Sequence, residues 1–226
     1  MIPRLGLDLE PGIHIMRELH DLDLLDVAYG ATHGGAETIL APLSLFTVTG
    51  AYTPDLFSRP GLPLLAVKVV SQDLDRVPSL GGAIDRIVVT GEGNRILPNP
   101  GEAAQYARQV AGAGQEVGVF AEPSGAALKE LSRARIQWVF FSTEAIFRAT
   151  QAQEAQDEIA KLSSAALAAS RINLRVALWG PTGRHLPTAL AAISGVEEIY
   201  PVPDLWSMAL RLGWERAVSE YRILMR

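Results

Sequence analysis

Eight short apolar segments, separated mainly by helix-like segments, most limit how this chain of 226 residues folds. Several are almost continuously apolar, such as Leu-Leu-Ala-Val-Lys-Val-Val at 64–70, which is typical of parallel strands buried on both faces. Eight strands with intervening helices predict an α/β fold of the (β/α)8 type, a TIM barrel. The predicted strands cover residues 5–9, 38–43, 64–70, 86–90, 116–121, 138–142, 174–179 and 198–202.

A doubly wound open sheet is the alternative fold, because it has the same alternation of strands and helices. Dinucleotide binding there would require Gly-x-Gly-x-x-Gly directly after the first strand, where this chain reads Asp-Leu-Glu-Pro-Gly at 8–12. No Gly/Ser-rich linker or change of composition divides the chain, so we expect residues 1–226 to form a single TIM-barrel domain. Helices are predicted over 101–113, 124–134, 145–170 and 204–224, with Ser124 and Asp204 as N-caps.

The composition excludes several classes of function. Twenty Lys and Arg against twenty-five Asp and Glu give a formal net charge of −5, so the basic surface that nucleic acid requires is not expected. The absence of cysteine excludes thiolate nucleophiles and Cys-ligated zinc, and without a His-x-x-x-His spacing we expect no metal site. With no apolar run of membrane-spanning length and no signal-peptide pattern, we expect a cytoplasmic protein without membrane partners.

Lys68 is the leading catalytic candidate. It is one of only three lysines, and it lies inside the buried strand predicted at 64–70. A lysine in such a place must be paired or desolvated, and a desolvated lysine can form Schiff bases with carbonyl substrates. The alternatives are an ion pair with Glu10 or Glu122, or a side chain whose stem reaches along the barrel to the rim.

Other polar residues follow the predicted strands, where barrel enzymes carry their chemistry. Asp8 and Glu10 are a candidate acid and base or cation site; alternatively, they cap the next helix or bind Arg17. Glu122 and His185 are further candidates for acid or base. The candidate ligand-binding residues are Asn94 and Arg95, Ser142 and Thr143, and Thr182, Gly183 and Arg184.

The loop at 179–185, Trp-Gly-Pro-Thr-Gly-Arg-His, has two interpretations. Loops after the last two strands of barrels commonly bind phosphate, and Thr182, Gly183 and Arg184 suit that role. Proline has no N–H to offer a phosphate, however, and both this loop and the next one contain it. The sequence is compatible with both interpretations, a phosphate site and an ordinary loop.

Several segments match a known family, and they lie along most of the chain. They are Leu-Gly-Leu-Asp-Leu at 5–9, Gly-Ala-Glu at 35–37, Ala-Gly-Ala-Gly at 111–114, Leu-Arg-Val at 174–176, Ala-Leu-Ala-Ala-Ile at 189–193 and Glu-Arg-Ala-Val at 215–218. On these segments the chain resembles the pyridoxine 5′-phosphate synthases of vitamin B6 biosynthesis. The resemblance implies a barrel with extra helices that forms a homo-oligomer, typically an octamer, through barrel–barrel contacts. It also implies condensation of 1-deoxy-D-xylulose 5-phosphate with an amino-oxopropyl phosphate, with no metal or organic cofactor.

The family's polar site residues are largely replaced. Its catalytic Glu on the third strand corresponds to Lys68 or Val67, and Thr143 alone is kept from Glu-Ile-His-Thr-Gly. Its His-x-Arg becomes Pro-Leu-Ser at 42–44, and its Gly-His-Gly becomes Trp-Gly-Pro at 179–181. Its phosphate motif after the eighth strand becomes Val-Pro-Asp-Leu-Trp-Ser-Met at 202–208.

These replacements suggest a pseudoenzyme or partner subunit that has lost the parent condensation. The alternative is a repurposed enzyme in which Lys68 and Glu122 perform carbonyl or imine chemistry on a small metabolite, phosphorylated or not. Retained synthase activity is the third hypothesis. We expect Trp179, Trp206, Phe140 and Phe141 near the barrel mouth, where a filled pocket would favour the first hypothesis and an open one at Lys68 the second.

Overall fold

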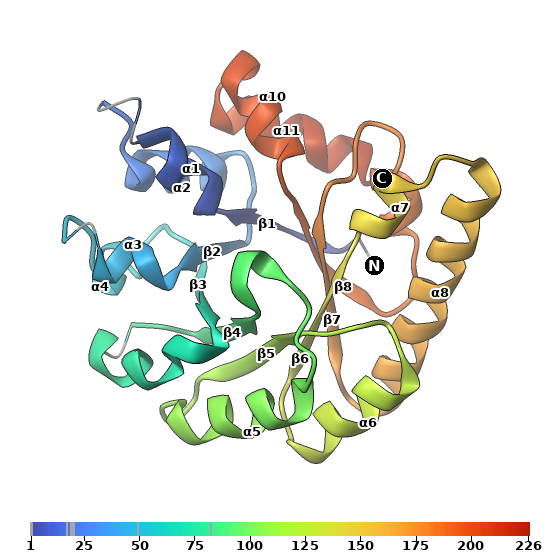
Figure 1. Ribbon diagram of the computed structural model, residues 1–226. Helices are drawn as coiled ribbons and strands as arrows, with labels where there is room; N and C mark the ends of the chain where they lie inside the picture. The colour runs from blue at the N-terminus through green and yellow to red at the C-terminus, as the bar shows by residue number, and fades with distance from the viewer. Residues whose placement is uncertain (1, 17, 19–20, 49, 82) are drawn as a thin grey trace.

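Eight parallel strands close into a barrel in chain order, with helices around it (Figure 1). The computed structural model describes residues 2–16, 18, 21–48, 50–81 and 83–226. The barrel confirms the predicted (β/α)8 fold, and the predicted strand ends agree with the structure to within two residues. The strands are β1 (Arg4–Asp8), β2 (Thr38–Pro42), β3 (Leu64–Val70), β4 (Arg86–Thr90), β5 (Glu116–Phe120), β6 (Trp138–Ser142), β7 (Arg175–Gly180) and β8 (Val196–Pro201).

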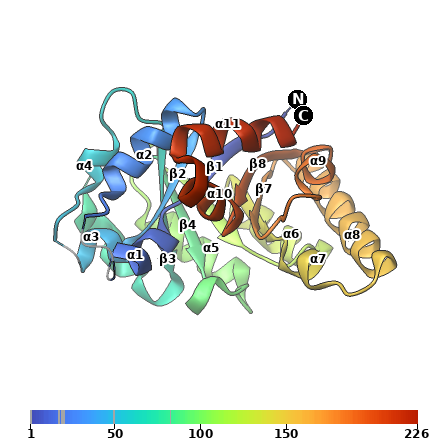
Figure 2. The same ribbon diagram turned by 90° about the horizontal axis from the view of Figure 1, so that it is seen from above.

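The helices form a ring outside the strands, and the last helix packs against α2, which closes the ring (Figure 2). The α-helices are α1 (Glu10–Met16), α2 (Leu24–His33), α3 (Leu43–Thr47), α4 (Pro54–Phe57), α5 (Pro100–Val110), α6 (Gly125–Arg133), α7 (Glu144–Arg148), α8 (Ala152–Arg171), α9 (Pro187–Ala191), α10 (Asp204–Leu212) and α11 (Trp214–Leu224). Two 3-10 segments, η1 (Ser71–Leu80) and η2 (Glu92–Asn94), follow β3 and β4.

Two of the predicted long helices are broken. The prediction over 145–170 is wrong because Ala149 turns extended after α7, and the N–H of Thr150 then donates to Glu154 at the start of α8. The prediction over 204–224 is wrong because Gly213, at φ +78°, separates α10 from α11. Ser124 is confirmed as an N-cap, since its hydroxyl accepts from the N–H of Ala127.

The barrel interior is filled by side chains, as parallel barrels require. A β-carbon on Gly6 would lie 2.2 Å from the ring of Tyr200, so only glycine at this position of β1 leaves room for that ring. The tyrosine hydroxyl donates to Glu198 at 2.8 Å, which fixes the ring in place. The apolar members of the interior are Leu40, Ala66, Val88, Phe120, Trp138, Phe140, Ala177 and Tyr200.

Charged side chains pack into the end of the barrel where the strands begin. Arg86 is fully buried, and its Nη1 lies 2.7 Å from Oε2 of the equally buried Glu198. The indole ring of Trp138 contacts two guanidinium groups, Arg86 at 3.8 Å and Arg175 at 4.1 Å from the ring centroid. The indole N–H donates to Glu116 at 2.7 Å. These contacts fill the end of the barrel where the strands begin. A functional site is expected at the opposite end, where the strands finish.

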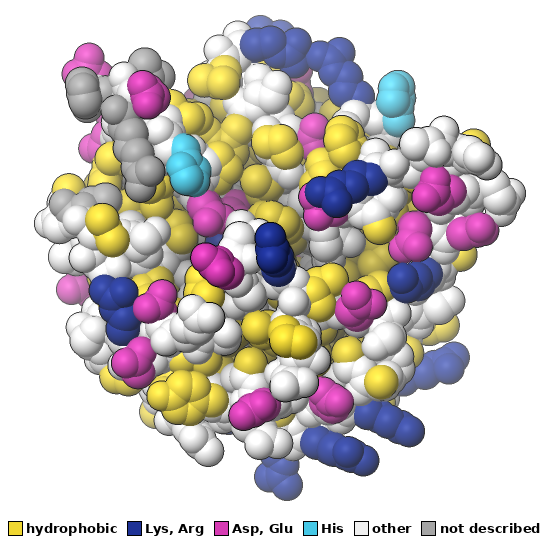
Figure 3. Space-filling model, viewed as in Figure 1, with side chains coloured by type: hydrophobic (Ala, Val, Ile, Leu, Met, Phe, Trp, Pro, Cys, Tyr) yellow, Lys and Arg dark blue, Asp and Glu magenta, His cyan; other side chains and the backbone are white. Residues whose placement is uncertain are grey.

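Acidic and basic side chains are interspersed over most of the face shown in Figure 3, and several basic side chains gather along its lower right edge. Within the part of the chain that the structure describes, no helix combines the length and apolar character needed to cross a bilayer.

Candidate functional site

Lys68 is the centre of a charged cluster at the mouth of the barrel. The residue lies in β3 beside Pro42 of β2 and Val88 of β4, and it is only 3% exposed. Its Nζ is 2.5 Å from Oδ2 of Asp8 and 2.6 Å from Oε2 of Glu10. The predicted ion pair with Glu10 is therefore confirmed, and Asp8 is a second partner.

Asp8 ends β1 and is 1% exposed. Besides Lys68, the indole N–H of Trp179 donates to its Oδ2 at 2.7 Å, and the backbone N–H of Glu10 donates to its Oδ1 at 2.9 Å. Asp8 thus also caps the start of α1, which was the alternative role predicted for it from the sequence. The other predicted partner, Arg17, lies outside the described residues. Because the Asp8 carboxylate accepts hydrogen bonds from three donors, it is held in place as a counter-charge for Lys68.

Glu10 is the first residue of α1 and not part of the strand, yet its side chain points back to Lys68. The Nδ2 of Asn94, from η2, donates to the same Oε2 at 2.6 Å. Burial raises the pKa of Glu10, but attraction to the Lys68 ammonium and the hydrogen bonds from Lys68 and Asn94 outweigh this effect. The net pKa is lowered from its ordinary value, and Glu10 is a carboxylate at neutral pH.

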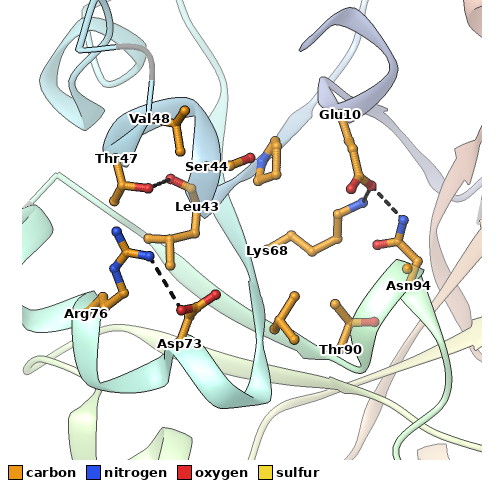
Figure 4. Close-up of a pocket in the computed structure, with 13 residues that line it drawn as sticks. Glu10, Leu43, Ser44, Thr47, Val48, Lys68, Asp73, Arg76, Thr90 and Asn94 are labelled. Carbon is orange, nitrogen blue, oxygen red and sulfur yellow. Dashed lines mark hydrogen bonds and ion pairs between the residues drawn. The ribbon is translucent and has the colours of Figure 1, made fainter. Parts of the chain in front are cut away.

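A cavity of about 250 Å³ opens beside this cluster. Figure 4 shows Glu10, Lys68 and Asn94 on one side of it, and Asp73 with Arg76 on the other. The lining comes from the ends of β2, β3 and β4, from the segments that follow them, and from Glu10 at the start of α1. Its remaining members are Pro42, Leu43, Ser44, Thr47, Val48, Val70, Thr90 and Gly93.

The mouth is closed on its other side by aromatic rings. Trp179 packs edge-on against Phe120 with ring centroids 5.4 Å apart, and Phe120 stacks on Phe140 at 5.3 Å. The prediction for Phe141 is wrong, because its side chain packs in the core between barrel and helices. Trp206 lies near the mouth as predicted, where its indole N–H donates to the backbone oxygen of Asp8 at 2.8 Å, but it belongs to the core outside the barrel and does not fill the interior. The mouth is therefore filled over β5 to β7 and open over β2 to β4.

The loop after β7 binds the carboxylate of Asp204, a residue of the same chain. The backbone N–H groups of Thr182 and Gly183 donate to Oδ2 of Asp204 at 2.6 and 3.0 Å. The hydroxyl of Thr182 lies 3.2 Å from the same oxygen. Two successive N–H groups on one oxygen form a backbone anion-binding nest, a frequent phosphate-binding arrangement. The prediction of Asp204 as the N-cap of α10 is wrong: Asp204 is the first residue of the helix, and Pro203 occupies the N-cap position.

The remaining predicted site residues do not join Lys68. Glu122 is exposed and, with Ser142, lines a separate cavity of about 220 Å³. Arg95 and His185 are exposed, and Arg184 lines a groove beside α10 and α11. Thr143 is buried and donates to the backbone oxygen of Pro181 at 2.7 Å, a contact that joins two loops.

The sequence interpretation missed two parts of the site. Asp73 and Arg76 belong to the segment directly after the strand of Lys68, so the strand-end rule applied to 71–76 would have found them. No local signal pointed to the contact of Asp204 with a loop more than twenty positions earlier. Among the described residues, no three His, Asp or Glu side chains gather as metal ligands would.

The fold and the position of the cavity define a TIM-barrel protein whose candidate site lies at the carboxyl ends of its strands. Solved structures agree on the fold over the whole chain, including KGPDC from Streptococcus mutans (TM-score 0.65, 13% identity, 98% of that chain). Orotidine 5′-monophosphate decarboxylase from Methanocaldococcus jannaschii is similar to the same degree (TM-score 0.65, 12% identity, 100% of that chain). At these identities the likeness concerns the fold alone.

Sequence comparison gives the family. The profile described as "Pyridoxal phosphate biosynthesis protein PdxJ" matches residues 85–226, and the chain belongs to this family. The pyridoxine 5′-phosphate synthase of Synechococcus sp. (strain RCC307) is 31% identical over 139 residues, which are 61% of this chain and 54% of that protein. The enzyme of the same name from Prochlorococcus marinus (strain MIT 9303) is 27% identical over 182 residues, 80% and 71% of the two chains. The chain thus matches about half the length of the first relative.

Proposed function

We propose that this member of the PdxJ family has lost the parent condensation and acts as a pseudoenzyme or partner subunit. The observation that carries the proposal is the Asp204 carboxylate in the nest formed by Thr182 and Gly183. Both substrates implied by the family resemblance bear phosphate groups. A phosphate entering this nest would have to displace a carboxylate already bonded there and would be repelled by its charge.

Lys68 supports the same proposal. The resemblance puts a catalytic Glu of the family at or beside this position on the third strand. Here the position holds an ammonium whose charge is matched by Asp8 and Glu10. Loss of one general acid or base typically costs ~10²–10⁴ in rate, so reversal of this charge together with a blocked anion site is incompatible with efficient condensation.

The experiment is growth of a strain that lacks its pyridoxine 5′-phosphate synthase and carries this gene. We expect no growth without added pyridoxine, although immunoblotting detects the protein, while the gene for the Synechococcus relative restores growth. Restored growth with this gene would overturn the proposal.

A repurposed enzyme is the second candidate, favoured by the open cavity that reaches Lys68 and Glu10. Lys68 would pass one proton to a neighbouring carboxylate, attack a substrate carbonyl and release water to form an imine. Glu122, the partner expected from the sequence, lies in a different cavity and has no part in this version. Borohydride reduction with pyruvate or glyceraldehyde, followed by peptide mass spectrometry, would label Lys68 ahead of Lys129 and Lys161. Absence of label at Lys68 counts against it.

Family membership also leads us to propose a cytoplasmic homo-oligomer built through barrel–barrel contacts. Light scattering coupled to size exclusion tests the assembly, and a mass equal to one chain at micromolar concentration would contradict it.

A further inference from the structure

The cavity beside Lys68 has hydrogen-bond acceptors without partners at one end. Glu10 uses only Oε2 for Lys68 and Asn94, and among the described residues no donor reaches its Oε1. The Oδ1 of Asn94 likewise has no donor there, because this side chain is bonded through its Nδ2. Two neighbouring acceptors that face a cavity suit a ligand group rich in N–H donors, such as an ammonium.

The electrostatics at this end favour a cation. Asp8 and Glu10 together outweigh the single charge of Lys68, so the cluster retains one net negative charge. The Glu10 side chain is 33% exposed, whereas those of Asp8 and Lys68 are covered. Lys68 and Glu10 both line the cavity, and Glu10 is the more exposed of the two to a ligand there.

The other end of the cavity carries a guanidinium group. Arg76, on η1, contacts Asp73 through Nη1 alone at 3.4 Å, and both side chains are about half exposed. An exposed ion pair of this length is weak. The remaining N–H groups of Arg76 can bind a carboxylate in the bidentate manner that its planar shape favours. Figure 4 shows Arg76 across the cavity from Glu10.

Apolar side chains lie between the two polar ends, among them Leu43 and Val70. At about 250 Å³ the cavity is smaller than the ~300–1,000 Å³ of pockets that hold drug-sized ligands. A short aliphatic chain with a polar group at each end matches this lining and this size.

We propose that the cavity binds a small zwitterion of the ω-amino acid type, with its ammonium at Glu10 and Asn94 and its carboxylate at Arg76. A phosphate ester is disfavoured, because its two negative charges would face Glu10 and Asp73 while Lys68 is already paired. This site is independent of the Asp204 nest, so the proposal holds whether or not the family condensation is lost.

The test is isothermal titration of the full chain with glycine, β-alanine, γ-aminobutyrate and δ-aminovalerate. Butyrate, which lacks the amine, and butylamine, which lacks the carboxylate, are the matched ligands. We expect one chain length to bind at least tenfold more tightly than butyrate and butylamine. Glu10→Gln and Arg76→Gln should each weaken that binding about tenfold, because each removes one charge contact.

The control variant is Glu122→Gln, which removes a carboxylate from the neighbouring cavity and should leave binding unchanged. Arg76 is half exposed and outside the core, so its variant is expected to fold even if Glu10→Gln is destabilised. The proposal is overturned if no ω-amino acid binds at millimolar concentration. It is also overturned if butyrate binds equally well, or if Arg76→Gln has no effect on binding.

Discussion

The ammonium of Lys68 and the carboxylate of Asp8 form an ion pair closed off from solvent, with Nζ 2.5 Å from Oδ2. The pair spans the barrel mouth from β1 to β3, and Trp179 and Glu10 complete its shell. Such a pair adds little net stability compared with apolar residues, but loss of one member leaves an uncompensated buried charge. It therefore fixes the shape of the mouth and makes both residues sensitive to substitution.

Lys68→Met should destabilise the protein by about 3 kcal/mol, because it leaves the buried Asp8 side chain without its main partner. Urea unfolding at pH 7 measures the change. Lys161→Met is the matched control: Lys161 forms an exposed pair with Glu158 at 3.6 Å, and its loss should cost no more than about 0.5 kcal/mol. The double variant Asp8→Asn/Lys68→Met should recover much of the lost stability, and a fully additive double variant would contradict the pairing.

The pH dependence of stability should reveal Glu10. Its pKa in the folded protein is lowered, so its contribution is complete above the ordinary value of 4.5 and is lost as the pH falls through the lower folded value. Unfolding of the wild type and of Glu10→Gln, measured between pH 7 and pH 3, should give a stability difference that shrinks below about pH 4.5. A difference that stays constant over this range would show that Lys68 and Asn94 do not stabilise the charged form.

Asp204→Ala should expose the nest formed by Thr182 and Gly183. The loss of hydrogen bonds to a carboxylate should cost roughly 2 kcal/mol. Inorganic phosphate should then raise the melting temperature of the variant more than that of the wild type, because the freed N–H groups accept an anion. Asp157→Ala makes the same charge change on the exposed surface of α8 and should show no added phosphate effect. Equal phosphate shifts in all three proteins would contradict this account of the nest.

Two glycines provide a matched test of packing in the barrel. Gly6→Ala places a methyl group 2.2 Å from the fixed ring of Tyr200 and should cost about 1–3 kcal/mol. Gly125→Ala, at the start of α6 with nothing within 4 Å, should be neutral or slightly stabilising because alanine favours helix. Thermal unfolding measures both. If Gly6→Ala proved as stable as Gly125→Ala, the packing of the Tyr200 ring against Gly6 would be looser than the 2.2 Å approach indicates.

The strands could be predicted from the sequence because each is a short local run of apolar residues whose ends are marked by turns and polar side chains. Lys68 could be singled out for the same reason, since a charge inside such a run needs a partner. The helix prediction over 204–224 was wrong where a single glycine, Gly213, interrupts an otherwise continuous helical pattern.

The contacts that define the site were harder to predict, because they join distant parts of the chain. Asp8 and Trp179 are far apart in sequence, and Asp204 and Thr182 belong to segments that local capping rules treat separately. Asp204 stands at the start of a helical pattern, where an aspartate predicts an N-cap. Only the arrangement of β7 beside β8 brings the loop N–H groups to its carboxylate.

The proposed loss of the family's condensation can be tested on the purified protein. Formation of pyridoxine 5′-phosphate from 1-deoxy-D-xylulose 5-phosphate and the amino-oxopropyl phosphate is followed by chromatography, with the Synechococcus relative as positive control. We expect no product above the level without protein under conditions in which the relative turns over. Product formation at a rate within tenfold of the relative would contradict it.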